Sequence, residues 1–186
     1  IYVRRSKVDG YRSRAAYKLI EIDEKFRIFK NGISVIDLGA APGSWSQYLS
    51  KKIKNSKIVS IDLREMEAID NTIQVLGDFT EEKNQSKIKG FFKSNVDVVL
   101  SDMAVNTTGN KNIDSIYTGE LCMEAMLFSK KILNNDGKFI SKIFMGSTFN
   151  EIITEAKLIF REVKVFKPKS SRKDSKESFI ICKNLR

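Results

Sequence analysis

The sequence predicts an α/β fold in which a doubly wound, mostly parallel sheet of seven strands ends with an antiparallel C-terminal strand. Two observations support this prediction. Short apolar runs of strand length alternate with segments of helical periodicity, which is typical of parallel strands connected by helices. The last two apolar runs are joined by a basic stretch without room for a helix, so they should pair antiparallel. We expect residues 1–186 to form a single domain.

The first half of the chain begins with a basic arm, residues 1–12, followed by a predicted helix over residues 13–29. Apolar residues recur in that helix at spacings of three and four, Ser13 stands at its start, and Asn31-Gly32 is a pair that ends helices. The other expected elements of this half are a strand over 33–38, a helix over 44–53 and strands over 57–62 and 72–76.

The second half continues the alternation, and its run 96–102 is the most strand-like of the chain. Residues 103–115 are rich in Asn, Thr and Gly, which predicts a mobile loop. The remaining expected elements are a helical stretch over 80–93, a helix with the apolar stripe Leu121, Ala125, Phe128 and Ile132 that ends at 134–137, a strand over 138–144, a helix over 148–160 and strands over 163–166 and 178–182.

The composition excludes several kinds of site and location. There is no histidine, so catalytic triads, zinc sites and proton shuttles that depend on histidine are excluded. Cys122 and Cys182 lie in apolar sequence without C-x-x-C spacing, which indicates buried thiols in a reducing compartment. No apolar run approaches the roughly 20 residues of a membrane helix, and no signal-peptide pattern opens the chain. We therefore expect a soluble, cytoplasmic protein.

The net charge of +10 is concentrated in two short segments. Residues 1–18 and residues 164–176 each carry six cations against one acid, and the rest of the chain is balanced. Such a distribution indicates a surface that faces a polyanion, although solvated lysine-rich segments would produce the same pattern. The candidate contacts to phosphate are Arg4, Arg5, Arg12, Arg14, Lys167, Lys169 and Arg172.

Four aspartates fall at or just after the ends of expected strands. They are Asp37, Asp62, Asp78 and Asp102. Ligands of doubly wound sheets bind beyond the carboxyl ends of the strands, and the turn from Gly39 to Gly43 lets the backbone approach one closely. The turn is not the G-x-G-x-x-G of dinucleotide sites, and Asp62 is suitably spaced to bind ribose hydroxyls. A positively charged nucleoside such as S-adenosylmethionine therefore fits better than a pyrophosphate, although each aspartate singly would be interpreted as a helix N-cap.

Five segments of the chain together resemble a known family. They are Tyr11-Arg-Ser-Arg-Ala-Ala-Tyr-Lys-Leu19, Asp37-Leu-Gly-Ala-Ala-Pro-Gly-Ser-Trp-Ser-Gln47, Ser101-Asp-Met-Ala-Val-Asn-Thr-Thr-Gly109, Lys142-Ile-Phe144, and Lys167-Pro-Lys-Ser-Ser-Arg172 with Glu177. In order and spacing they resemble the FtsJ family, the RrmJ/RlmE-type ribosomal RNA 2′-O-methyltransferases. The resemblance implies a Rossmann-like methyltransferase fold and methylation of a uridine ribose 2′-hydroxyl in 23S-type large-subunit ribosomal RNA.

The resemblance also implies roles for individual residues. A catalytic set of two lysines and two acids carries over onto Lys18, Asp102, Lys142 and Glu177. Contacts to S-adenosylmethionine carry over onto Gly43, Trp45, Asp62, Asp78 and Asp102, and the glycine-containing turn adds Asp37, Gly39 and Pro42. Methyl transfer from a sulfonium needs no metal ion. The expected partner is ribosomal RNA within the large subunit, bound by a monomer.

The chain departs from the family's pattern at three points. Val105 stands where many relatives have Pro, and Ser44 stands where a second Gly is common. The chain also starts at Ile1, within the family's N-terminal arm, so we expect further residues upstream.

Other interpretations remain. A transfer-RNA or cap ribose methyltransferase would use the same residues, and a non-catalytic RNA-binding module would keep the basic surface. Lys142 has apolar neighbours on both sides, and a lysine on a buried strand usually has a charged partner or a function, which favours the enzyme. Trp45, the only tryptophan, could instead belong to the core. A dehydrogenase is disfavoured by the missing dinucleotide motif and the antiparallel final strands.

Overall fold

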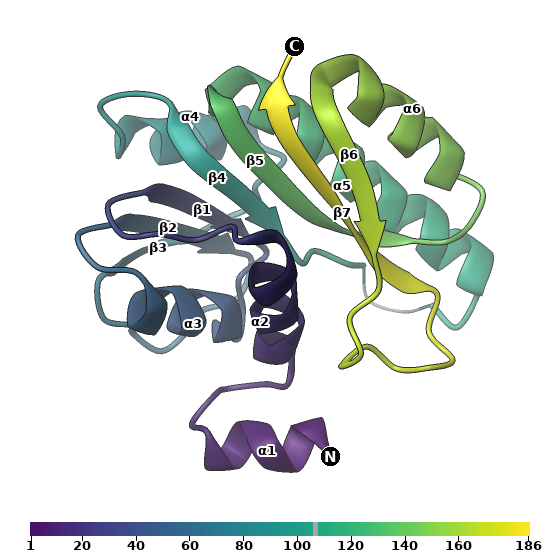
Figure 1. Cartoon of the computed structure of the whole chain (residues 1–186), viewed down its shortest axis with the longest axis horizontal. Coiled ribbons are helices and arrows are strands. Elements are labelled where there is room, and N and C mark those ends of the chain that lie inside the picture. The colour runs from purple at the N-terminus through teal and green to yellow at the C-terminus, as the bar shows by residue number, and fades with distance from the viewer. Residues whose placement is uncertain (106–107) are drawn as a thin grey trace.

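The computed structural model describes residues 1–105 and 108–186, in which seven strands form one sheet of order β3-β2-β1-β4-β5-β7-β6 (Figure 1). The strands are β1 (Ser34–Leu38), β2 (Lys57–Asp62), β3 (Thr72–Leu76), β4 (Val96–Ser101), β5 (Leu133–Phe144), β6 (Phe160–Phe166) and β7 (Glu177–Leu185). The helices are α1 (Tyr2–Val8), α2 (Ala15–Phe26), α3 (Ser44–Lys52), α4 (Glu82–Gly90), α5 (Lys111–Ile132) and α6 (Phe149–Ile159).

The direction of the strands confirms the predicted fold class. Strands β1 to β5 pair parallel to one another, and β7 lies between β5 and β6, antiparallel to both. The carboxyl ends of the parallel strands therefore meet at one edge of the sheet. Because β7 runs the other way, its first residue, Glu177, pairs with Phe144 at that same edge.

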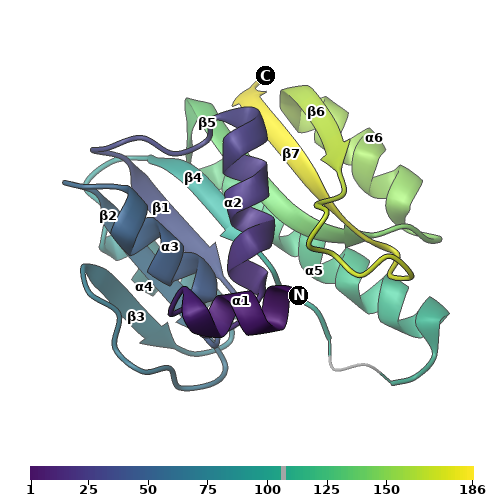
Figure 2. The same ribbon diagram turned by 60° about the horizontal axis from the view of Figure 1, so that its bottom comes forward.

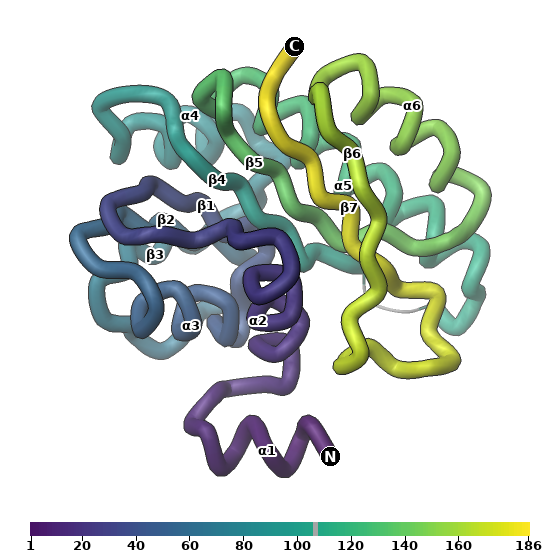
Figure 3. Tube along the Cα trace, in the orientation of Figure 1, coloured from purple at the N-terminus to yellow at the C-terminus, as the bar shows by residue number. Residues whose placement is uncertain are grey.

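Helices cover both faces of the sheet, as expected for a doubly wound fold. Helices α2 and α3 pack on one face, where Leu19 and Leu49 are fully buried, and α4, α5 and α6 pack on the other, where Ile88 and Ala125 are fully buried (Figure 1). The interior strands are thus apolar on both faces, as in other buried parallel sheets. The starts of α1 and α2 and the loop between β6 and β7 all lie at the end of the molecule where the parallel strands finish (Figure 3).

Helix α2 ends at Phe26, so the predicted end at residue 29 is wrong. The carboxylate of Asp23 accepts hydrogen bonds from the backbone N–H groups of Ile28 and Phe29, both at 3.0 Å, which draws the chain out of the helix. Arg27 adopts a left-handed conformation at this C-terminus. Ile28 and Phe29 are buried although they lie outside the helix, which is why the apolar pattern of the sequence extends beyond its end.

Two further helical segments differ from the prediction. Residues 111–115 belong to α5 rather than to a loop, because the side chain of Asn110 caps the helix by accepting from the N–H groups of Asn112 and Ile113. Residues 106–107 of the predicted loop lie outside the described residues. The arm contains the unpredicted helix α1, which contacts α2 through the rings of Tyr2 and Tyr17 at 5.4 Å.

Candidate active site

The turn that follows β1 requires glycine at two positions. Gly39 and Gly43 have φ angles of 69° and 107°, in the left-handed region that favours glycine. A Cβ on Gly39 would lie 2.3 Å from Cγ of Met103, and one on Gly43 would lie 2.9 Å from a guanidinium nitrogen of Arg12. The N–H groups of Gly39 and Ala40 donate to the carbonyl of Ile61, which fixes the turn beside the end of β2.

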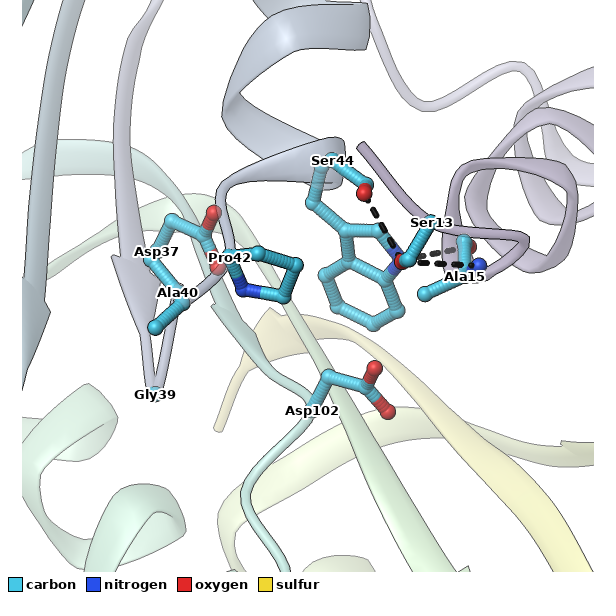
Figure 4. Close-up of a pocket in the computed structure, with 10 residues that line it drawn as sticks. Ser13, Ala15, Asp37, Gly39, Ala40, Pro42, Ser44 and Asp102 are labelled. Atoms are coloured by element: carbon cyan, nitrogen blue, oxygen red, sulfur yellow. Dashed lines mark hydrogen bonds between the residues drawn. The ribbon is translucent and has the colours of Figure 1, made fainter. Parts of the chain in front are cut away.

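A small cavity lies between this turn, the start of α2 and the end of β4. Figure 4 shows Asp37, Pro42 and Asp102 around it, with Ser13 and Ala15 on the side opposite Asp37. Its lining contains five of the residues predicted to contact a cofactor, namely Asp37, Gly39, Pro42, Trp45 and Asp102. Five further residues line it that the sequence did not predict as contacts, namely Ser13, Ala15, Ala40, Ala41 and Ser44.

Asp37 is a buried carboxyl group with one oxygen left open. Its Oδ2 accepts a hydrogen bond from Ser46 at 2.7 Å, whereas Oδ1 is buried and has no hydrogen-bond partner among the described residues. Burial raises the pKa of Asp37 to about 7, and the negative charges of Asp102 and Asp62 add to the increase. A cationic ligand in the cavity would supply both a donor and a positive charge.

Asp62 and Asp78 lie at the ends of β2 and β3, beyond the lining of this cavity. Asp62 accepts the N–H groups of Ala41 and Arg64, both at 2.9 Å, and Asp78 accepts the N–H of Thr80 at 2.9 Å. Asp62 therefore links the turn after β1 to the end of β2, and Asp78 shapes the turn that follows β3. Neither is the N-cap of a helix, which was the alternative role considered for each of them, because the N-caps of α3 and α4 are Gly43 and Glu81. Leu63, which follows Asp62, is 69% exposed and offers apolar surface next to it.

Lys18, Asp102, Lys142 and Glu177 converge at the carboxyl edge of the sheet. Lys18 Nζ on α2 is 2.7 Å from Oε1 of Glu177. Lys142 Nζ on β5 is 3.0 Å from Oδ1 of Asp102 and 3.7 Å from Oε2 of Glu177. The four side chains thus form a continuous, mostly buried chain of alternating charge, of which Asp102 also borders the cavity.

The charges of this chain stabilise one another against burial. Burial by itself would lower the pKa of Lys142, but the carboxylates of Asp102 and Glu177 outweigh it and the pKa is raised. Burial would raise the pKa of Glu177, but the ammonium groups of Lys18 and Lys142 outweigh it and the pKa is lowered. Lys142 is therefore a cation and Glu177 an anion at neutral pH.

Comparison with known proteins identifies the family. The model of the FtsJ-like methyltransferase family matches residues 11–185. The chain belongs to this family. This confirms the family resemblance in the sequence motifs. Ribosomal RNA large subunit methyltransferase E of Pelagibacter ubique (strain HTCC1062) is 72% identical over 100% of this chain and 92% of its own length.

Solved structures agree with the fold of this FtsJ-like methyltransferase. A Plasmodium falciparum protein described as a ribosomal RNA methyltransferase matches with a TM-score of 0.83 and 34% identity, covering 94% of this chain and 98% of that one. A Streptococcus mutans protein described as a methyltransferase, in complex with SAH, has the same fold at a TM-score of 0.59 and 13% identity, covering 89% of this chain and 97% of that one.

The predicted phosphate contacts of the FtsJ-like methyltransferase differ in exposure and in the groups that they already bind. Arg4, Lys167, Lys169 and Arg172 are exposed. Arg12 differs, because its guanidinium donates to the backbone carbonyls of Pro42, Glu67 and Ala68 at 2.9 to 3.0 Å. Arg5 is exposed, pairs with Asp9 and lies over the ring of Tyr17, and Arg14 is half-buried at the start of α2. Arg12 thus supports the turn beside the cavity, a role that its sequence position did not reveal.

Trp45 of the FtsJ-like methyltransferase is a core residue that also borders the cavity. It is 2% exposed, packs against Phe179 and donates its indole N–H to the carbonyl of Ala15 at 2.8 Å.

Among residues 1–105 and 108–186, no helix combines the length and hydropathy that a membrane span requires. The same residues contain no group of three His, Cys, Asp or Glu side chains arranged for a metal ion.

Proposed function

We propose that the protein transfers a methyl group from S-adenosylmethionine to a ribose 2′-hydroxyl of RNA, in particular of a uridine in 23S-type large-subunit ribosomal RNA. The observation that carries the proposal is the continuous chain from Lys18 through Glu177 and Lys142 to Asp102, which ends at the cavity behind the glycine turn. The name of the 72% identical relative supports the ribosomal substrate.

The residues around the cavity fit the proposed cofactor. Oδ1 of Asp37, which is unpaired among the described residues, is a partner for a positive charge, and Gly39, which lines the cavity without a side chain, leaves backbone at its edge. We assign the contacts to Asp37, Gly39, Pro42, Trp45 and Asp102 around the cavity, to Gly43 in the same turn, and to Asp62 and Asp78 at the next two strand ends. When bound, the sulfonium supplies an activated methyl group and no metal is required.

The chain of charges accounts for the acceptor side of the reaction. Methyl transfer needs a lone pair of the 2′-oxygen in line with the S–CH₃ bond and a destination for the hydroxyl proton. Lys142 starts as an ammonium, so its first role is to donate a hydrogen bond that orients the 2′-oxygen. The proton becomes strongly acidic once the oxygen is alkylated. Lys142 then gives one of its own protons to the carboxylate of Asp102, 3.0 Å away, accepts the proton of the oxygen and remains an ammonium. Glu177 and Lys18 hold Lys142 in place.

The exposed cations support an RNA partner. Arg4, Lys167, Lys169 and Arg172 lie on segments that lead to Lys18 or to Glu177, so phosphates bound there would surround the active site. Such contacts fix the orientation of RNA rather than reading its bases. We propose that the protein acts as a cytoplasmic monomer on the large subunit.

A methyl-transfer assay with labelled S-adenosylmethionine tests the proposal. The substrates are large ribosomal subunits that lack the modification, protein-free ribosomal RNA and transfer RNA, with Lys142→Ala as the inactive control. We expect label in 2′-O-methyluridine of the large-subunit RNA. Label only in transfer RNA would overturn the ribosomal substrate, and cofactor binding without turnover on any RNA would indicate a non-catalytic RNA-binding module.

A further inference from the structure

The loop between β6 and β7, residues 167–176, is attached to helix α2 by a side chain that the proposed mechanism does not use. The two carboxylate oxygens of Glu21 accept the backbone N–H groups of Lys169 at 2.5 Å and Ser170 at 3.0 Å. Two successive N–H groups directed at one anion form a favourable binding arrangement. Although exposed lysine and arginine side chains lie nearby, the carboxylate of Glu21 binds the backbone of the loop.

Glu21 also lies on the same side of α2 as Lys18. Residues three apart on a helix are neighbours on its surface. Lys18 reaches Glu177 at the start of β7, and Glu21 reaches the loop that leads into Glu177. Figure 2 shows this loop beside α2, with α1 at the start of the same helix. Helix α2 therefore holds both Glu177 and the loop that precedes it.

The attached loop contributes directly to the environment of Glu177. Ser171 is buried and donates its hydroxyl hydrogen bond to Oε1 of Glu177 at 2.9 Å, the same oxygen that Lys18 contacts at 2.7 Å. Oε2 is left to face Lys142 at 3.7 Å. The position of Ser171 depends on the N–H groups just before it, which Glu21 binds.

We propose that Glu21 and Ser171 are positioning residues of the methyl-acceptor side: Glu21 fixes the basic loop on α2, and Ser171 orients the carboxylate of Glu177 between Lys18 and Lys142. The inference rests on the proposed function. It extends that function by making the basic loop a preorganised part of the RNA-binding surface, whose cations Lys169 and Arg172 are held at a fixed distance from the acceptor.

The variant Glu21→Gln tests the attachment, with Glu24→Gln, an exposed residue of the same helix, as the matched control. Glutamine keeps one acceptor oxygen and loses the charge. A hydrogen bond to a charged group contributes enough for a roughly tenfold effect on an equilibrium, so we expect the KM for RNA to rise about tenfold with little change in cofactor affinity. Trypsin should also cleave the variant faster after Lys169, Arg172 or Lys173.

Ser171→Ala tests the orientation of Glu177, and Ser171→Thr keeps the hydroxyl. The charged groups that face Glu177 are Lys18 of α2 and Lys142 of β5, and both remain in these variants. Losing the serine hydrogen bond raises the pKa of Glu177, so the acid limb of the kcat profile should move up by about one pH unit. The threonine variant should restore it.

The outcomes separate the two proposals. A wild-type protein that methylates no RNA would refute the proposed function. Tryptic cleavage at the wild-type rate in Glu21→Gln would refute the attachment, whether or not the enzyme is active. An active Ser171→Ala variant with an unmoved acid limb, or a threonine variant that behaves like alanine, would refute the positioning role of Ser171.

Discussion

The buried carboxyl group of Asp37 should make the free protein less stable than it would be with a neutral side chain. Its pKa of about 7 lies far above the ordinary value of 3.8, chiefly because of burial, and Ser46 satisfies only one of its two oxygens. A difference of this size corresponds to about 4 kcal/mol spent on ionising the group inside the fold. Asp37→Asn removes that cost and can keep the bond from Ser46.

The dependence on pH distinguishes this effect from a simple change in packing. The native carboxyl group binds its proton at higher pH than the unfolded one, so its contribution to stability declines as pH rises from about 4 to about 7 and is constant above that. The free energy of unfolding of Asp37→Asn should therefore match that of the wild type near pH 4.5 and exceed it by a few kcal/mol at pH 8.

Equilibrium unfolding in urea at pH 4.5, 6, 7 and 8 measures the difference, with Asp136→Asn, an exposed carboxylate, as the control. A gain that does not grow with pH, or a loss at pH 8, would refute the reasoning. Calorimetry with S-adenosylmethionine should show weaker binding to Asp37→Asn at pH 8, because a neutral amide no longer balances the positive charge of the ligand. Stability gained at the expense of affinity is typical of a functional site.

Three further predictions follow from the site. Lys142→Ala should abolish methyl transfer while cofactor and RNA still bind. Lys142→Arg should not restore transfer, because a guanidinium cannot accept a proton. An active arginine variant in the transfer assay would contradict this prediction. A plot of the logarithm of RNA affinity against the logarithm of salt concentration should have a slope of about −3 to −4 if four or five phosphates are neutralised. Lys169→Gln or Arg172→Gln should make this slope less steep. Equal slopes would mean that these cations are merely solvated. Arg12→Gln should weaken binding of S-adenosylmethionine, measured by calorimetry, because the guanidinium holds the carbonyls of Pro42 and Ala68; unchanged cofactor affinity would argue against this support.

Local patterns predicted those parts of the fold that depend on neighbours in sequence. Glycine at positions 39 and 43 marks the turn because the left-handed backbone there leaves little choice of residue. The alternation of strands and helices predicted the parallel sheet, and the short basic stretch predicted the antiparallel pair. Lys142 stood out because a lysine among apolar strand residues needs a counter-charge, which Asp102 and Glu177 provide.

Features that depend on distant contacts were not predictable in the same way. Glu21 and the loop amide that it binds are 148 residues apart in the chain, so no local pattern relates them. Helix α1 contacts Tyr17 of α2, and the end of α2 depends on the side chain of Asp23 turning back on the backbone. The charge of Arg12 suggested a phosphate contact, but its guanidinium donates to three carbonyl groups, that of Pro42 and those of Glu67 and Ala68 in another loop.

The position of the single tryptophan provides an optical probe of the active site. Trp45 is fixed by its bond to Ala15 and by packing against Phe179, and one edge of it borders the cavity. No second indole contributes background emission, because the chain has one Trp. A ligand that enters the cavity should change the surroundings of this ring and therefore its emission, so that occupancy can be followed in the unlabelled protein. Because Phe179, which packs against Trp45, and Glu177 both belong to β7, the same signal should also report a movement of this strand.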